Sequence, residues 1–81
     1  MERVIRATPL DHFRIEVEFS DGLKGVVDLS ERLFGSMFAP LMDPVFFDQL
    51  RVDEFGAICW PNGADLAPDA LYKTISMLQA G

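Results

Sequence analysis

The stretch of residues 13–29, FRIEVEFSDGLKGVVDL, constrains the fold of this chain more than any other part of it. Its first half alternates apolar and charged side chains, which is typical of a strand with one buried face. The turn signal Asp21-Gly22 follows directly, and a second apolar run begins after it. The stretch therefore predicts an antiparallel hairpin whose register depends on the length of its loop.

Two loop lengths give two different registers for this hairpin. A two-residue loop would place Phe19 opposite Lys24, which mixes a core residue with a solvent-facing one. A three-residue loop, Ser20-Asp21-Gly22, with a left-handed glycine at its end, keeps apolar residues opposite one another and also brings opposite charges together on the outer face. We therefore predict the pairs Phe13–Leu29, Ile15–Val27, Phe19–Leu23, Glu18–Lys24 and Arg14–Asp28.

Residues 50–60, LRVDEFGAICW, predict a second hairpin by the same argument. A three-residue loop, Glu54-Phe55-Gly56, again ends in a glycine that can adopt the left-handed conformation. The predicted pairs are Val52–Ile58 and Leu50–Trp60. Cys59 then points to the face opposite Trp60 and lies beside Arg51.

The remaining segments predict one strand and several short helices. Their expected ranges are a strand over residues 2–8 with a turn at 9–11, a helix at 31–34, an apolar loop at 36–41, a helix from Pro44 to about residue 49 capped by Asp43, a loop at 60–68, and a helix at 69–78 with the stripe Leu71, Ile75 and Leu78. His12 should open the second strand. The chain is thus expected to be one α+β domain, residues 1–81, with a small antiparallel sheet of two hairpins and an N-terminal strand, short helices and a C-terminal helix.

The charge of the chain restricts its partners. It has 13 acidic and 7 basic residues and a formal net charge of −6. Such a balance disfavours nucleic acid, which needs clustered Lys and Arg, and suits a basic protein partner. The alternative is that acidity is merely common among bacterial cytoplasmic proteins. No apolar run is long enough to span a membrane and no secretory signal is visible, so we expect a cytoplasmic protein without membrane contact.

Residues that could carry chemistry are sparse. The sequence has no phosphate-binding glycine loop, no dinucleotide motif and no Cys/His cluster. His12 is the only histidine and lacks the sequence neighbours of a metal site or a catalytic triad. Cys59 is the only cysteine, so it cannot form an internal disulfide, and no base accompanies it. We expect no enzyme activity, no metal and no cofactor.

One patch around the Asn62-Gly63 bend could bind a partner. It combines carboxylates, an amide and two aromatic side chains, as protein interfaces often do. The candidate residues are Trp60, Asn62, Asp65, Asp69 and Tyr72, together with any exposed part of the aromatic-rich segment 34–47. In the structural alternative Trp60 belongs to the core, Asp65 bonds backbone amides before the last helix, and Tyr72 packs on Trp60.

Three segments carry a resemblance to a known family. They are FxDGxxxxVDL from Phe19 to Leu29, PLMDPxxF from Pro40 to Phe47, and WPNGADLAPDALY from Trp60 to Tyr72. Together they resemble the bacterial domain of unknown function 2442, over nearly the whole chain. In that pattern a Ser is expected where this chain has Ala67, which leaves the cap of the last helix weak. The resemblance implies an α+β fold with an antiparallel sheet and supplies no catalytic residues.

The resemblance also places the chain among antitoxin-like proteins that accompany small toxin-like partners. Our first hypothesis is therefore an acidic module that binds a small basic protein. The rival hypothesis is a small-molecule-sensing or regulatory domain that uses a pocket in the Trp60–Tyr72 loop. A homodimer is compatible with either hypothesis.

Overall fold

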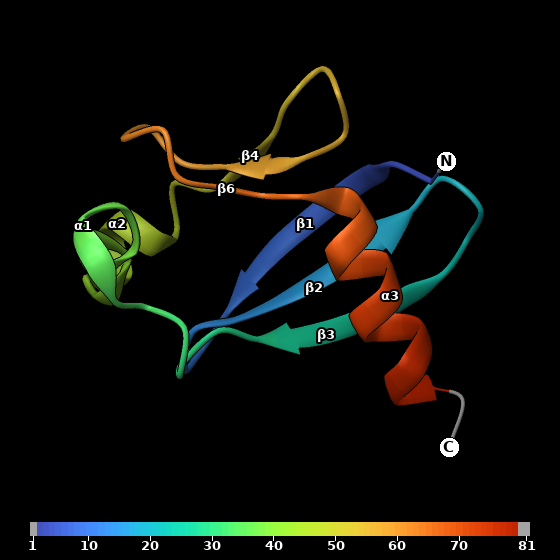
Figure 1. The fold of residues 1–81 in the computed structure, drawn as a ribbon, viewed down its shortest axis with the longest axis horizontal. Helices are drawn as coiled ribbons and strands as arrows, with labels where there is room; N and C mark the ends of the chain where they lie inside the picture. The colour runs from blue at the N-terminus through green and yellow to red at the C-terminus, as the bar shows by residue number, and fades with distance from the viewer. Residues whose placement is uncertain (1, 80–81) are drawn as a thin grey trace.

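The computed structural model describes residues 2–79 and contains two small antiparallel sheets with helices beside them (Figure 1). The first sheet has the order β1-β2-β3, and the second has the order β4-β5-β6. The α+β class is confirmed. In chain order the elements are β1 (Val4–Leu10), β2 (Arg14–Phe19), β3 (Lys24–Asp28), α1 (Gly35–Phe38), the 3-10 helix η1 (Ala39–Met42), α2 (Pro44–Phe47), β4 (Arg51–Val52), β5 (Ile58–Cys59), β6 (Asp65–Leu66) and α3 (Pro68–Gln79).

The register of the first hairpin is confirmed. The Phe19 amide donates to the Leu23 carbonyl at 2.8 Å, and Gly22 has a φ of 95°. This closes the three-residue loop with a left-handed glycine, as the alternation of the strands requires. The paired residues include Arg14–Asp28, Ile15–Val27 and Glu18–Lys24.

The register of the second hairpin is confirmed as well. Val52 pairs with Ile58, and Arg51 pairs with Cys59. Gly56 has a φ of 79°, and the Asp53 side chain accepts hydrogen bonds from the amides of Phe55 and Ala57 inside the loop. The two strands of this hairpin are only two residues long, so the hydrogen bonds of the loop help to hold the hairpin in its conformation.

The first turn of the chain differs from its prediction. β1 continues through Pro9 to Leu10, and the turn lies at residues 11–13 instead of 9–11. Proline is tolerated because β1 is the first strand in the order of its sheet, and an edge strand does not need every amide. His12 lies in this turn and does not open β2. It has a φ of 63°, and Phe13 has a φ of 60°.

Phe13 explains why the turn adopts this conformation. Its ring packs edge-on against Phe47 with the centroids 5.5 Å apart, and its carbonyl accepts the Leu29 amide at 2.9 Å. Left-handed backbone costs a non-glycine residue about 1 kcal/mol or more. Packing of the Phe13 ring against the core offsets that cost. The sequence of the turn alone does not predict this packing, because the ring partner is distant in the chain.

Segment 30–42 contains two wrong predictions. The helix expected at 31–34 is a turn, closed by the Arg32 amide on the Leu29 carbonyl, and Phe34 has an extended backbone with φ −134° and ψ 167°. Burial of Leu33 in the core overrides the weak local helix preference. The loop expected at 36–41 is instead helical, with α1 followed by η1.

The later segments show smaller differences. Asp43 caps α2 as predicted, since its carboxylate accepts from the Val45 amide at 3.0 Å, but α2 already ends at Phe47. The expected 60–68 loop contains β6, a strand too short to leave a periodic pattern. In α3 Leu71 and Ile75 are buried, whereas Leu78 is exposed. Leu78 does not join the stripe because the last turn of α3 extends past β3 (Figure 1).

One hydrophobic core lies between the two sheets and α3. Trp60 is buried in it, and its indole N–H donates to the Phe47 carbonyl at 3.0 Å. The second sheet is fastened to the start of β1, because the Val4 amide donates to the Gly56 carbonyl at 3.0 Å. The buried residues of the core are Val4, Ile15, Val17, Phe19, Val27, Leu29, Leu33, Leu41, Phe47, Ile58, Trp60, Ala64, Leu71 and Ile75.

The two loop glycines should respond differently to substitution. A Cβ at Gly56 would lie 2.4 Å from the Cβ of Arg3, whereas a Cβ at Gly22 would meet nothing within 4 Å. Gly22→Ala should therefore cost only the backbone strain, about 1 kcal/mol, and Gly22→Val at least that much. Gly56→Ala should cost clearly more, about 3 kcal/mol, because β1 must also shift.

Urea unfolding of the three variants and the wild-type chain measures these differences. Equal losses of unfolding free energy for Gly22→Ala and Gly56→Ala would contradict the close approach of the second loop to β1. An unchanged stability of Gly22→Val would contradict the left-handed conformation of the first loop.

Candidate functional site

The five residues predicted to bind a partner do not form one patch. Trp60 is 2% exposed and belongs to the core, as the structural alternative proposed. Figure 1 shows α1 and α2 at one end of the molecule and the β2–β3 loop at the other. Asn62 is bonded to the first end and Tyr72 to the second.

Asn62 fastens its loop to α1. Its side-chain amide donates to the Met37 carbonyl at 2.8 Å, and its side-chain oxygen accepts from the Ala64 amide at 3.0 Å. The second bond makes the turn, and the first holds the turn against the helix. Both polar ends of the side chain are occupied, so Asn62 positions the loop.

Tyr72 packs on Phe19 and not on Trp60. The two ring centroids lie 5.0 Å apart in an edge-to-face arrangement. The Tyr72 hydroxyl donates to the Asp21 carboxylate at 2.5 Å. These contacts join α3 to the tip of the first hairpin, across 51 residues of sequence.

This bond shifts the pKa values of both partners. The hydrogen bond from Tyr72, together with one from the Leu23 amide, lowers the pKa of Asp21 below its ordinary value. The same bond and the nearby carboxylate raise the pKa of Tyr72. A smaller network acts at the other end of the hairpin, where bonds from Ser30 lower the pKa of Asp28.

The two candidate aspartates lie on the surface. Asp65 pairs with Cys59 in the second sheet, and Cys59 pairs with Arg51, so the three side chains share one face of that sheet. Asp69 is exposed on the first turn of α3. Both carboxylates are exposed and therefore accessible to a partner.

Segment 34–47, which we call the lid, carries the largest exposed apolar side chains near these residues. Leu41 and Phe47 hold it on the core. Other side chains of the lid face solvent, namely Phe34 (74% exposed), Met37 (43%), Met42 (59%) and Val45 (72%). These four side chains are the exposed part of segment 34–47, and their role in partner binding stays a prediction.

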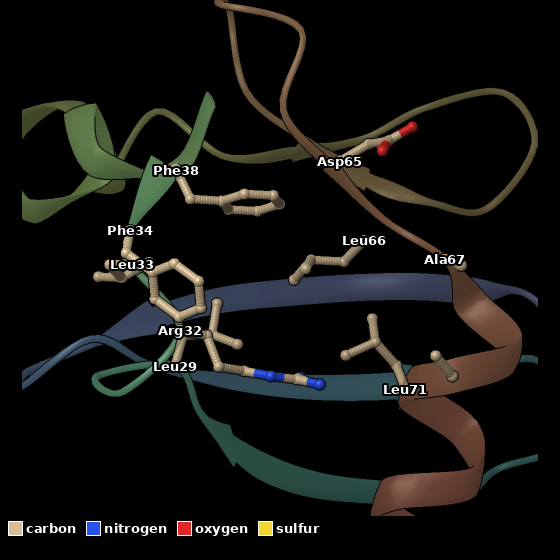
Figure 2. A pocket seen from close by; sticks show the side chains of 10 residues that line it. Leu29, Arg32, Leu33, Phe34, Phe38, Asp65, Leu66, Ala67 and Leu71 are labelled. Atoms are coloured by element: carbon tan, nitrogen blue, oxygen red, sulfur yellow. The ribbon is translucent and has the colours of Figure 1, made fainter. Parts of the chain in front are cut away.

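A groove of about 370 Å³ lies between the lid and the start of α3 (Figure 2). The rings of Phe34 and Phe38 stand on one side of it, and Leu66 and Leu71 stand on the other. The remaining lining residues are Leu29, Arg32, Leu33, Asp65, Ala67 and Ala70. We refer to it as the lid groove.

Sequence reasoning did not find the lid groove. Its walls come from segments 29–38 and 65–71, whose contact depends on the whole fold. The main local signal is the high content of phenylalanine in residues 34–47. Small residues at 67 and 70 were a second, weaker signal.

No metal-binding cluster occurs in the described part of the chain. Residues 2–79 contain no group of three or more His, Cys, Asp or Glu side chains that could hold a metal ion. His12 is exposed in its turn, and Cys59 is half-buried. Within the same residues, no helix combines the length and apolarity needed to cross a membrane.

Comparison with known proteins gives a family match and nothing further. The model of DUF2442, described as a protein of unknown function, matches residues 4–76. Searches of curated proteins and of solved structures gave no match.

The bond between Tyr72 and Asp21 predicts a pH-dependent stability. The lowered pKa of Asp21 means that the bond stabilises the fold above the ordinary value of 3.8 and loses its effect as the pH falls through the folded-state pKa. The raised pKa of Tyr72 means that the effect persists below 10.0 and disappears as the pH rises through the folded-state value. The stability difference between wild type and Tyr72→Phe should thus be largest at neutral pH.

Urea unfolding from about pH 3 to about pH 11 measures that difference. An NMR titration should also find the pKa of Asp21 closer to its ordinary value in Tyr72→Phe. A stability difference that is the same at every pH would contradict the bond as the source of stabilisation.

Proposed function

The chain belongs to DUF2442, a family of proteins of unknown function, and we propose that it is a protein-binding module whose lid docks a small basic partner. The observation that carries this proposal is the exposure of four apolar side chains on one short segment, residues 34–45. Exposed apolar surface of this kind is typical of an interaction site. The four side chains are those of Phe34, Met37, Met42 and Val45.

The charge of the chain supports a basic partner. Thirteen acidic residues against seven basic ones give a net charge of −6. Asp43 and Asp48 are exposed near the C-terminal end of the lid. Asp65 is exposed near the N-terminal end of the lid, with which it lines the lid groove. Carboxylates around an apolar centre steer a basic partner and increase its association rate.

The resemblance to antitoxin-like proteins supports the same kind of partner. An antitoxin neutralises a small toxin by covering part of its surface. We propose that role for this chain, with the apolar lid as the centre of the interface and Asp65 and Asp69 at its rim. Tyr72 and Trp60 have structural contacts and are not part of the proposed interface.

A pull-down from the source cell with matched variants tests the proposal. The double variant Met42→Ser and Val45→Ser removes exposed apolar surface from the lid. Phe55→Ser, at a residue that is 76% exposed in the second hairpin loop, removes a comparable apolar side chain elsewhere. We expect a small basic protein to be retained by wild type and Phe55→Ser, and its affinity to fall at least about tenfold with the lid variant.

Salt dependence provides a second measurement. Asp65→Asn with Asp69→Asn should lower the association rate and make it less sensitive to salt, with a smaller effect on dissociation. Circular dichroism checks that each variant is folded. Equal retention of the partner by wild type and the lid variant would rule out the lid as the interface.

The lid groove favours a second candidate function. Five of its lining residues, Asp65, Leu66, Ala67, Ala70 and Leu71, come from the segment Trp60–Tyr72, where a small-molecule pocket was expected. A volume of about 370 Å³ is within the range of small-molecule sites. A small-molecule-sensing or regulatory domain would bind its ligand in this groove. Val45 does not line the groove, so a substitution of Val45 should leave the affinity for that ligand unchanged.

A further inference from the structure

We propose that the lid groove binds a small monocarboxylate with an apolar body, either an aromatic ring or a medium-length aliphatic chain. The inference rests on the second candidate function and assigns the class of ligand. It is carried by three features of the groove wall: its apolar lining, an arginine at its side, and the start of a helix without a capping side chain.

The apolar lining accounts for the body of the ligand. Leu29, Leu33 and Leu71 are buried and form the deep part of the wall. Phe34 and Phe38 stand across from Leu66, so that a flat ring or a chain can lie between them (Figure 2). A small-molecule site typically combines such a lining with a few polar groups that fix orientation.

Arg32 accounts for the carboxylate. Figure 2 shows its side chain along the groove with the guanidinium directed toward α3. Among residues 2–79, no hydrogen bond or ion pair of the Arg32 guanidinium is found, whereas the Arg6 guanidinium forms an ion pair with Glu18. A guanidinium presents parallel N–H donors that match the two oxygens of a carboxylate.

The carboxylate of Asp65 does not oppose this assignment. Successive side chains of a strand point to opposite faces, and Leu66 points into the groove. Asp65 lines the groove, but its carboxylate is directed away from Leu66, toward the face that it shares with Cys59. Arg32 is the charged group whose side chain lies along the groove.

The start of α3 adds to the attraction for an anion. A helix begins with amide groups that have no partner within the helix, and its N-terminal end carries partial positive charge. Ala67, which precedes the helix, has no side-chain oxygen to cap those amides, and both Ala67 and Ala70 line the groove. Asp69 lies on the same turn but does not line the groove.

NMR titration of the labelled chain tests the proposal with two probes and their neutral counterparts. The probes are 3-phenylpropionate and octanoate, and the counterparts are the primary amides of the same acids. We expect both acids to shift the amide signals of Leu66, Ala67 and Ala70, and each amide to bind at least about tenfold more weakly than its acid.

Three variants assign the contacts. Arg32→Gln should weaken binding of both acids at least about tenfold and leave the neutral amides unaffected. Arg51→Gln, at an exposed arginine on the second sheet, is the matched control and should bind like wild type. Ala67→Asp supplies a capping carboxylate, so it should raise the Tm and weaken binding of the acids.

The outcomes separate this proposal from the function on which it rests. If acids and amides bind equally well in the groove and Arg32→Gln has no effect, the groove is a small-molecule site but the carboxylate assignment is wrong. If neither the acids nor the amides bind, both the assignment and the small-molecule function fail. The proposal that the lid binds a protein is tested with variants of Met42 and Val45, which do not line the groove, so neither result contradicts it.

Discussion

The fastening of the second sheet to β1 is the contact on which the rest of the structure depends. Strands of two residues cannot form a stable sheet by themselves. The Gly56 carbonyl accepts the Val4 amide, and the Arg3 guanidinium donates to the Glu54 carbonyl at 2.6 Å. Gly56 can come this close because it has no Cβ. The contact holds the second sheet over the core, and through Trp60 and Phe47 it positions the lid.

The hairpins could be predicted from the sequence because their information is local. In both cases a glycine and the alternation of a few neighbours determine the loop length, and each face tests the register independently. The cap of α2 by Asp43 is local in the same way. The turn at His12 and Phe13 could not be predicted, since its conformation depends on the contact of Phe13 with Phe47, 34 positions further along the chain.

The candidate site was predicted only in part, for the same physical reason. Sequence proximity suggested that Asn62 and Tyr72 act together, but their hydrogen-bond partners, Met37 and Asp21, lie at opposite ends of the molecule. Both side chains stabilise the fold by hydrogen bonds to residues that are far away in the sequence. What remains accessible is the part whose side chains have no such partners, namely the apolar lid with the carboxylates near it, and the lid groove.

The small residues in the wall of the groove support its assignment as a site. A domain of 81 residues buries only about 60–65% of its unfolded surface, so additional apolar contact would increase its stability noticeably. A leucine in place of Ala70 could fill part of the groove. Its burial would stabilise the fold by roughly 25 cal/mol for each Å² of apolar surface removed from water. A capping residue in place of Ala67 would stabilise α3 by about 1 kcal/mol. This chain has alanine at both positions, and both alanines line the groove together with Arg32. The two positions at which a larger or capping residue would stabilise the fold are therefore also the positions at which the groove stays open.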